Sequence, residues 1–223
     1  MPSWKIHSKI GYDILKKINV NEKYFMIGNL LPDQDSYNIK DLKVGISRKI
    51  THYISDENYK VGINLPDYEK FFDKYKIKLN NPVILGYLVH LLTDFFWNNY
   101  IYEKYFIKEN GIYVGVKLNS KKIYKCNFRE MNTFKQEDFE VFNNSIDLKK
   151  KNYKFCLNSK YFKELDEIKI SKHNLFLVGE YLNIDHNSDI CDKKFKFLSE
   201  NECNKILGEC ENFILNYLKS KKI

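Results

Sequence analysis

Apolar residues recur at helical spacing near the start of the chain. Isoleucine stands at every fourth position from Ile6 to Ile18, and residues 4–18 therefore predict a first helix. Ser3 precedes this segment and is a good helix N-cap, because its hydroxyl can accept from a free backbone N–H group of the first turn. The repeated isoleucines predict that one face of this helix is buried.

The longest apolar segment extends from Asn81 to about Phe106. Asn81 can cap a helix, and Pro82 fits the first helical position, where no N–H donor is needed. Positions from Val83 to Trp97 are apolar on nearly all sides, which is typical of a central, buried helix. Weaker helical patterns predict further helices at 41–54, 67–75, 137–148, 160–168, 173–182 and 199–218.

Two segments depart from helical spacing. The apolar run Tyr24–Leu31 ends at Pro32, so we expect a turn or loop from Pro32 to Asp35. Residues 111–125 alternate apolar and polar around Asn119-Ser120, which predicts a small β-hairpin. With no repeat and no low-complexity linker, the pattern indicates an all-α (mainly α) fold with one domain over residues 1–223.

The composition supports a folded globular chain. Its 223 residues are 43% hydrophobic and include only 9 Gly and 4 Pro, which argues against a disordered or linker-rich protein. The net charge of +8 raises the alternative of a nucleic-acid partner. All but two of the 37 basic residues are lysine, however, and Ala is absent, so we attribute much of the charge to compositional bias rather than to a phosphate-binding patch.

The cysteines and the N-terminal sequence bear on the cellular compartment. Five cysteines without a CxxC pair do not predict a disulfide framework or a cysteine zinc knuckle. The first residues show no charged segment followed by an apolar run, so no secretory signal is expected. The most apolar stretch is too short to span a bilayer. We therefore expect a cytoplasmic protein with reduced thiols and no transmembrane segment.

His90 and Asp94 provide the clearest chemical signal. They lie four residues apart in the long apolar segment, so a helix places both side chains on one face, one turn apart. A buried carboxylate there needs a cationic partner, since burial of an unpaired charge is costly. The pair is compatible with a shared metal ion, or with a simple His–Asp hydrogen bond.

Three further residues strengthen the metal hypothesis. His7 faces inward on the first predicted helix, Asp33 follows Pro32, and His52 lies between Thr51 and Tyr53. Each alone says little, and an inward histidine is more often a core residue than a ligand. Together with His90 and Asp94 they supply three imidazoles and two carboxylates, a donor set that suits zinc.

In this order the motifs resemble the bacterial zinc-dependent phospholipase C family, whose superfamily includes zinc-dependent single-strand nucleases. The resemblance rests on Trp4 and His7, then Gly28-Asn29-Leu30-Leu31-Pro32-Asp33, Thr51-His52-Tyr53, and the segment from Gly86 to Asp94. It covers about residues 1–107. It implies an all-α fold with metals bound between helices.

The resemblance also implies a site and a reaction. Asp33, His52, His90 and Asp94 would hold one zinc ion, and Asp94 would bridge to a second ion held by His7. A zinc-bound hydroxide would then attack a phosphodiester substrate, such as a phospholipid, at its head group, with Asp33 as the catalytic residue that orients the nucleophile. Tyr100 stands where the family has a histidine of a third zinc site, so we expect one or two ions.

Two alternatives remain open from the sequence. In the first, the protein is also a zinc-dependent hydrolase, but its substrate is a nucleic acid or nucleotide, which makes it a nuclease or nucleotide phosphodiesterase. The chain can also be a non-catalytic metal-binding relative. An HD-type phosphohydrolase is not expected, because no histidine is directly followed by aspartate. The sequence does not indicate an oligomeric state.

Overall fold

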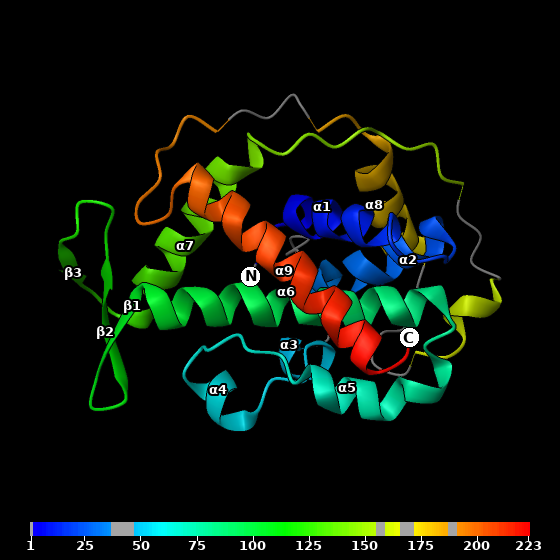
Figure 1. Cartoon of the computed structure of the whole chain (residues 1–223), viewed down its shortest axis with the longest axis horizontal. Helices are drawn as coiled ribbons and strands as arrows, with labels where there is room; N and C mark the ends of the chain where they lie inside the picture. The colour runs from blue at the N-terminus through cyan, green and yellow to red at the C-terminus, as the bar shows by residue number, and fades with distance from the viewer. Residues whose placement is uncertain (1, 37–46, 155–158, 166–171, 187–190) are drawn as a thin grey trace.

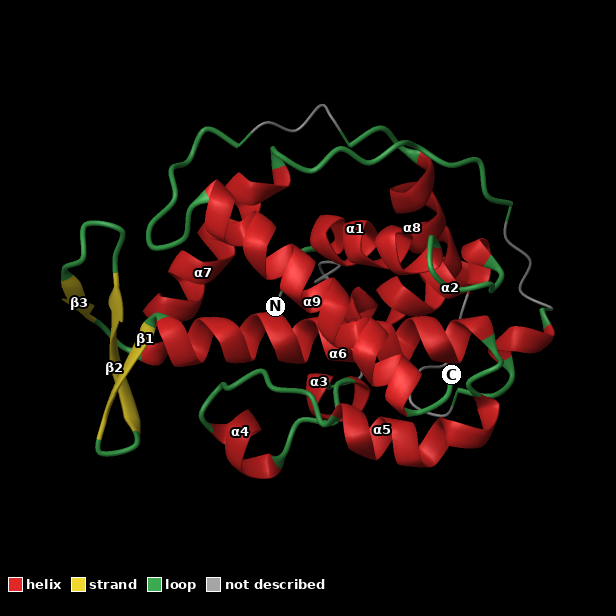
Figure 2. Cartoon of the chain, viewed as in Figure 1, coloured by secondary structure: helices red, strands yellow, loops and turns green. Residues whose placement is uncertain are grey.

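The structure is a computed structural model that describes residues 2–36, 47–154, 159–165, 172–186 and 191–223. Most of the described chain is helical, and a small sheet lies at one end of the molecule (Figures 1 and 2). The elements in chain order are α1 (Trp4–Leu15), α2 (Glu22–Leu30), η1 (Leu31–Ser36), α3 (Arg48–Thr51), α4 (Asp56–Lys60), α5 (Tyr68–Tyr75), η2 (Lys76–Lys78), α6 (Pro82–Lys104), β1 (Phe106–Glu109), β2 (Ile112–Lys117), β3 (Ile123–Lys125), α7 (Phe128–Asn143), η3 (Lys160–Phe162), α8 (Lys172–Asn183) and α9 (Glu200–Ser220). The predicted mainly α fold is confirmed.

Helix α6 is the central element of the fold. Asn81 caps it, since its side-chain oxygen accepts from Val83 N at 2.9 Å, and Pro82 occupies the first turn as predicted. Helices α1, α2, α5 and α9 all pack against it, and α9 crosses it diagonally in Figure 1. Every residue from Pro82 to Asp94 is buried, which explains the apolar character of the segment on all sides.

The α2–α6 contact is the most extensive one between the described helices. It depends on Gly28 of α2 and Gly86 of α6, where the two backbones meet. A Cβ atom at Gly28 would lie 2.0 Å from the carbonyl oxygen of Val83, and one at Gly86 would lie 2.0 Å from that of Phe25. Neither position has room for a larger residue, so the two glycines set the separation of the helices.

Several predicted helices are confirmed with small shifts at their ends. The segment 4–18 forms α1, 67–75 forms α5, 173–182 forms α8 and 199–218 forms α9. The predicted cap of α1 is present, because Ser3 Oγ accepts from Ile6 N at 3.2 Å.

Three predicted helices were wrong in extent. Helix α7 begins at Phe128 rather than 137, because Asn127 and Glu130 form a capping box, and it ends at Asn143. The segment 160–168 contains only the single turn η3, and its residues 166–168 lie outside the described residues.

The third is the segment 41–54, of which only Arg48–Thr51 is described as helix, with 41–46 outside the described residues. The turn predicted after the apolar run is instead the 3-10 helix η1, and the run itself belongs to α2.

The predicted hairpin is present but is part of a three-stranded antiparallel sheet, in the order β1-β2-β3. The additional strand β1 follows α6 directly. Its apolar residues continue the helical pattern of α6, which hid the boundary from sequence analysis. Asn110 and Gly111 join β1 to β2 with positive φ angles of 52° and 80°, the conformation of a tight hairpin turn.

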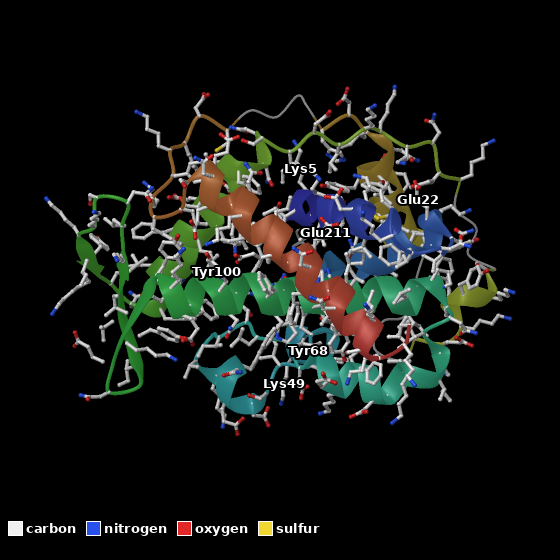
Figure 3. All side chains as sticks on the ribbon, viewed as in Figure 1. Lys5, Glu22, Lys49, Tyr68, Tyr100 and Glu211 are labelled. Carbon is white, nitrogen blue, oxygen red and sulfur yellow. The ribbon has the colours of Figure 1, made fainter. Side chains whose placement is uncertain are left out.

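Three further observations concern hydrophobicity, cysteines and charge. Among the described helices, none combines the length and the hydrophobicity needed to span a bilayer. The four described cysteines, Cys126, Cys191, Cys203 and Cys210, are free thiols. Charged side chains point outward along the periphery of the molecule (Figure 3).

Candidate metal centre

The five predicted site residues come together in the interior of the bundle. His7 lies on α1, Asp33 on η1, and His52 directly after α3, while His90 and Asp94 lie one turn apart on α6. Asp33 is 4% exposed and the other four are fully buried. A buried group of three imidazoles and two carboxylates is unusual, because charged side chains are seldom buried unless they are paired or bind a metal.

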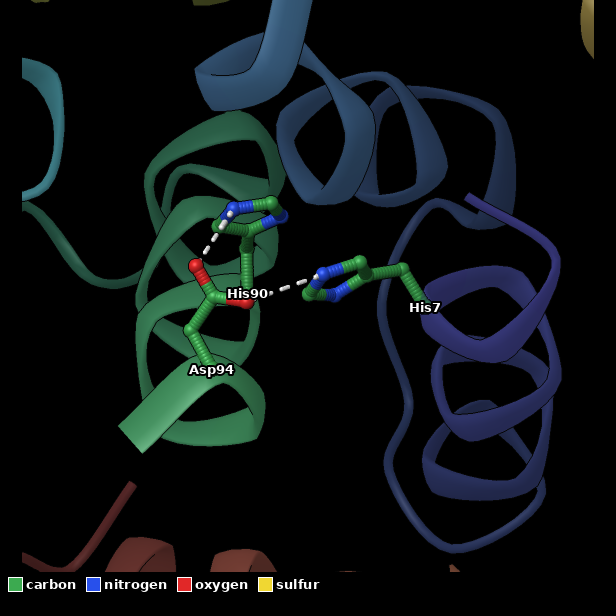
Figure 4. A group of neighbouring side chains, drawn as sticks. All are labelled: His7, His90 and Asp94. Carbon is green, nitrogen blue, oxygen red and sulfur yellow. Dashed lines mark ion pairs between the residues drawn. The ribbon is translucent and has the colours of Figure 1, made fainter. Parts of the chain in front are cut away.

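Asp94 faces all three imidazoles. Its Oδ1 lies 3.3 Å from His7 Nε2, and its Oδ2 lies 3.3 Å from His52 Nε2 and 3.6 Å from His90 Nε2. Figure 4 shows His7 reaching toward this carboxylate from a separate helix, with His90 on the same helix as Asp94. One carboxylate therefore joins ring nitrogens from three separate elements.

Asp33 faces the same nitrogens from another direction. Its Oδ1 lies 3.4 Å from His52 Nε2 and 3.9 Å from His90 Nε2, and its Oδ2 lies 3.9 Å from His7 Nε2. Arg48 donates from Nη2 to Asp33 Oδ1 at 2.7 Å. The sequence analysis did not assign Arg48 to the site. The sequence feature that could have pointed to Arg48 is its residue type, since it is one of two arginines in a lysine-rich chain.

Neighbouring polar groups orient the rings. His90 Nδ1 lies 2.8 Å from the carbonyl oxygen of Asn29, and His52 Nδ1 lies 2.8 Å from Thr51 Oγ1. A carbonyl oxygen only accepts, so His90 carries its proton on Nδ1 and presents Nε2 to the centre. This is the arrangement in which a metal-binding histidine donates its remote N–H to a carbonyl group.

Several polar atoms of the cluster lack a hydrogen bond. Both ring nitrogens of His7 and both carboxylate oxygens of Asp94 are buried without a hydrogen-bond partner. Each such atom carries a desolvation cost of about 1–3 kcal/mol. A cation bound among them would satisfy these atoms, so the residues present fit a metal ion.

Two overlapping groups have the geometry to hold an ion. His7, His90 and Asp94 form one, and Asp33, His52 and His90 form the other, with the potential ligand atoms of each within 4.8 Å of one another. Imidazole nitrogens and carboxylate oxygens are the donors that zinc accepts.

Neighbouring groups lower the pKa of both carboxyl groups in the cluster. Burial alone would raise the pKa of Asp94, but His90, His52 and His7 hold it well below its usual range. Burial likewise opposes ionisation of Asp33, yet His90, His52 and Arg48 lower its pKa. Both carboxylates are therefore ionised at neutral pH and available as ligands.

The pKa values of His90 and His52 are shifted in opposite directions. Burial, followed by the nearby charge of His7, lowers the pKa of His90 to about 3, so this ring is neutral. Burial also acts to lower the pKa of His52, but its contacts with Asp33 and Asp94 outweigh this effect and raise it. Without metal, the two carboxylates therefore favour the protonated form of His52.

His186 lies outside this cluster. Its Nε2 lies 2.6 Å from the carbonyl oxygen of Tyr181, whose ring also packs on Trp4. The side chain of His173 lies outside the described residues.

Comparison of the chain with protein-family models, with curated proteins and with solved structures found no match. The buried cluster itself is therefore the basis for assigning a function.

Proposed function

We propose that the chain is a metal-dependent phosphodiester hydrolase, similar to zinc-dependent phospholipase C. The observation that carries the proposal is the convergence of His7, Asp33, His52, His90 and Asp94 in one buried cluster with unsatisfied ligand atoms. The order of these residues along the chain, given above, relates the cluster to that family.

His7, His52, His90 and the two aspartates would hold one or two zinc ions. Zinc in such a donor set polarises a phosphoryl oxygen and lowers the pKa of bound water to about 7. Asp33 then has a second role, because its ionised carboxylate can orient a nucleophilic water and accept its proton. Arg48 fixes Asp33 by the 2.7 Å contact, and its partly exposed guanidinium is placed to bind a negatively charged substrate.

A second candidate is a metal site that only stabilises the fold. The observation in its favour is burial, since four of the five side chains have no exposed surface. Structural zinc sites are closed by protein ligands, whereas catalytic sites keep one position for water or substrate. Substrate turnover distinguishes the two.

The test combines metal content with activity. Protein purified without chelator is expected to contain zinc and to hydrolyse bis-p-nitrophenyl phosphate. EDTA should abolish the activity, and added zinc should restore it. Zinc bound without cleavage of this substrate, of phospholipid or of nucleic acid would favour the structural site. A protein that binds no metal under any of these conditions would rule out both candidates.

A further inference from the structure

Lys135 of α7 is a buried cation that the proposed site does not yet use. Its side chain is fully buried. The ammonium group donates to Asn98 Oδ1 at 2.7 Å and contacts the Tyr102 hydroxyl at 3.3 Å. Both partners are neutral, so the described structure leaves its charge without an anionic counterpart.

These contacts place Lys135 beside the metal cluster. Asp94, Asn98 and Tyr102 are spaced by four residues on α6, so they lie along one face of that helix. Asn98 lies about 6 Å from Asp94 along the helix axis, the rise of four residues. A further bond from Asn98 Nδ2 to the Asn64 carbonyl oxygen, at 2.8 Å, fixes the amide so that its oxygen faces Lys135.

A second buried charge on α7 shows how a purely structural role is satisfied. Asp138 accepts three backbone N–H bonds, from Lys196 at 2.5 Å, Phe197 at 3.1 Å and Leu198 at 2.8 Å. These bonds anchor the segment before α9 and account for the buried carboxylate. Lys135 lies on the same helix, but its partners among the described residues are neutral: the Asn98 amide oxygen and Tyr102, whose hydroxyl it contacts and whose ring centroid lies 4.8 Å from Nζ.

The surroundings of Lys135 favour an incoming anion. Burial lowers its pKa to about 7, while the negative charge of Asp94 acts in the opposite direction and Arg48 adds to the lowering. An anion placed between Lys135 and the cluster would restore the charged form and remove the cost of burying an unpaired ammonium.

We infer that Lys135 is an anion-binding residue. Its ammonium group donates a hydrogen bond to a phosphoryl oxygen of a ligand held at the His/Asp cluster. The inference rests on the proposed function, because the cluster must hold the metal that binds the rest of the phosphoryl group. Two cationic side chains then flank the cluster, Arg48 at Asp33 and Lys135 beyond Asp94. Together they would neutralise a phosphodiester and the charge that develops on it.

The test uses inorganic phosphate as the probe and the zinc-loaded full chain. Thermal unfolding is followed against phosphate concentration for the wild type and for Lys135→Met, which keeps the length of the side chain but removes its charge. Lys205→Met is the matched control, because Lys205 is exposed on α9. Zinc content is measured for each protein.

Phosphate should raise the Tm of the wild type and of Lys205→Met. In Lys135→Met the concentration needed for half of this shift should rise at least tenfold, with zinc content unchanged. Without phosphate, Lys135→Met should melt above the wild type, because an unpaired buried charge has been removed. Lys135→Gln, which keeps a donor for Asn98, is tested in parallel in case the methionine variant does not fold.

An unchanged phosphate response in zinc-loaded Lys135→Met or Lys135→Gln would overturn the inference, as would a wild type that binds zinc but not phosphate. Absence of zinc from the wild type would instead overturn the proposed function, and the inference with it. Displacement of phosphate by monomeric short-chain phosphatidylcholine or by a dinucleotide would identify which source of phosphodiester the site accepts.

Discussion

The imidazole rings of His7 and His90 stack face to face, with centroids 4.0 Å apart and planes inclined by 11°. The rings come from helices α1 and α6 and are completely buried. Both rings present Nε2 to the same carboxylate, since His7 Nε2 lies 3.3 Å from Asp94 Oδ1 and His90 Nε2 lies 3.6 Å from Asp94 Oδ2. The stack therefore places two potential ligand nitrogens where a single ion could bind both together with Asp94.

Replacement of His90 by alanine should remove metal and lower stability together. The side chain contributes to both potential ligand groups, and its loss leaves Asp94 buried with fewer partners. The expected destabilisation is about 2–5 kcal/mol, the range for truncating a large, fully buried side chain to alanine. Zinc content and urea unfolding measure the two effects. His186→Ala is the control and should change neither; a His90→Ala protein with full zinc content and wild-type stability would refute the site.

Replacement of Asp33 by asparagine should reduce turnover far more than it affects folding. The substitution keeps the shape of the side chain but removes the charge that would bind metal and orient water. We expect kcat to fall about 100-fold or more, while the Tm changes little. Steady-state kinetics and thermal unfolding of the same preparations provide the comparison. Equal kcat in the two proteins would exclude Asp33 from the reaction.

Replacement of Gly86 by alanine tests whether helix spacing controls the site. The new methyl group would collide with the Phe25 carbonyl and push α2 away from α6, which displaces the Asn29 carbonyl that orients His90. A loss of about 1–3 kcal/mol is expected, with weaker zinc binding. Gly208→Ala is the matched control, since a Cβ there meets nothing within 4 Å.

At Gly208 the higher helix propensity of alanine should leave stability unchanged or raise it by up to about 1 kcal/mol. Equal effects of the two substitutions on unfolding and on zinc affinity would contradict the role of the α2–α6 contact.

Zinc binding should release protons near neutral pH. Asp33 and Asp94 raise the pKa of His52 above its ordinary value of 6.5, so the metal-free protein holds a proton there that zinc must displace. Affinity should therefore rise as the pH increases through the His52 pKa, by about tenfold per unit below that pKa for one displaced proton. Calorimetry in two buffers of different ionisation enthalpy measures the release. Identical heats in both buffers would show that His52 binds no proton in the metal-free state.

The fold was predictable where local signals were strong. Asn81 and Pro82 marked the start of α6, and apolar residues on all sides marked its burial. The start of α7 was missed although Asn127 and Glu130 carried a capping-box signal, because few apolar residues follow them. Strand β1 was missed because its apolar residues extend the pattern of the preceding helix.

The site was predictable in part for a related reason. The chain contains only 5 His, so the order of the histidines and the spacing of His90 and Asp94 stand out, and the five predicted side chains converge as expected. Lys135 could not be found in this way, because nearly all basic residues of the chain are lysines and nothing local distinguishes a buried one. Its burial depends on side-chain contacts between α7 and α6, such as those of Lys135 with Asn98 and of Phe139 with Trp97, which only the three-dimensional structure shows.

The position of α9 has a consequence for how the protein is made. All five residues of the cluster precede residue 95, whereas α9, which packs against α1 and α6, begins more than 100 residues later at Glu200. The emerging chain therefore exposes the residues of the cluster, and the apolar faces around them, before the covering helix exists. Metal captured at that stage would hold α1 and α6 together and shorten the time during which a nascent chain can aggregate.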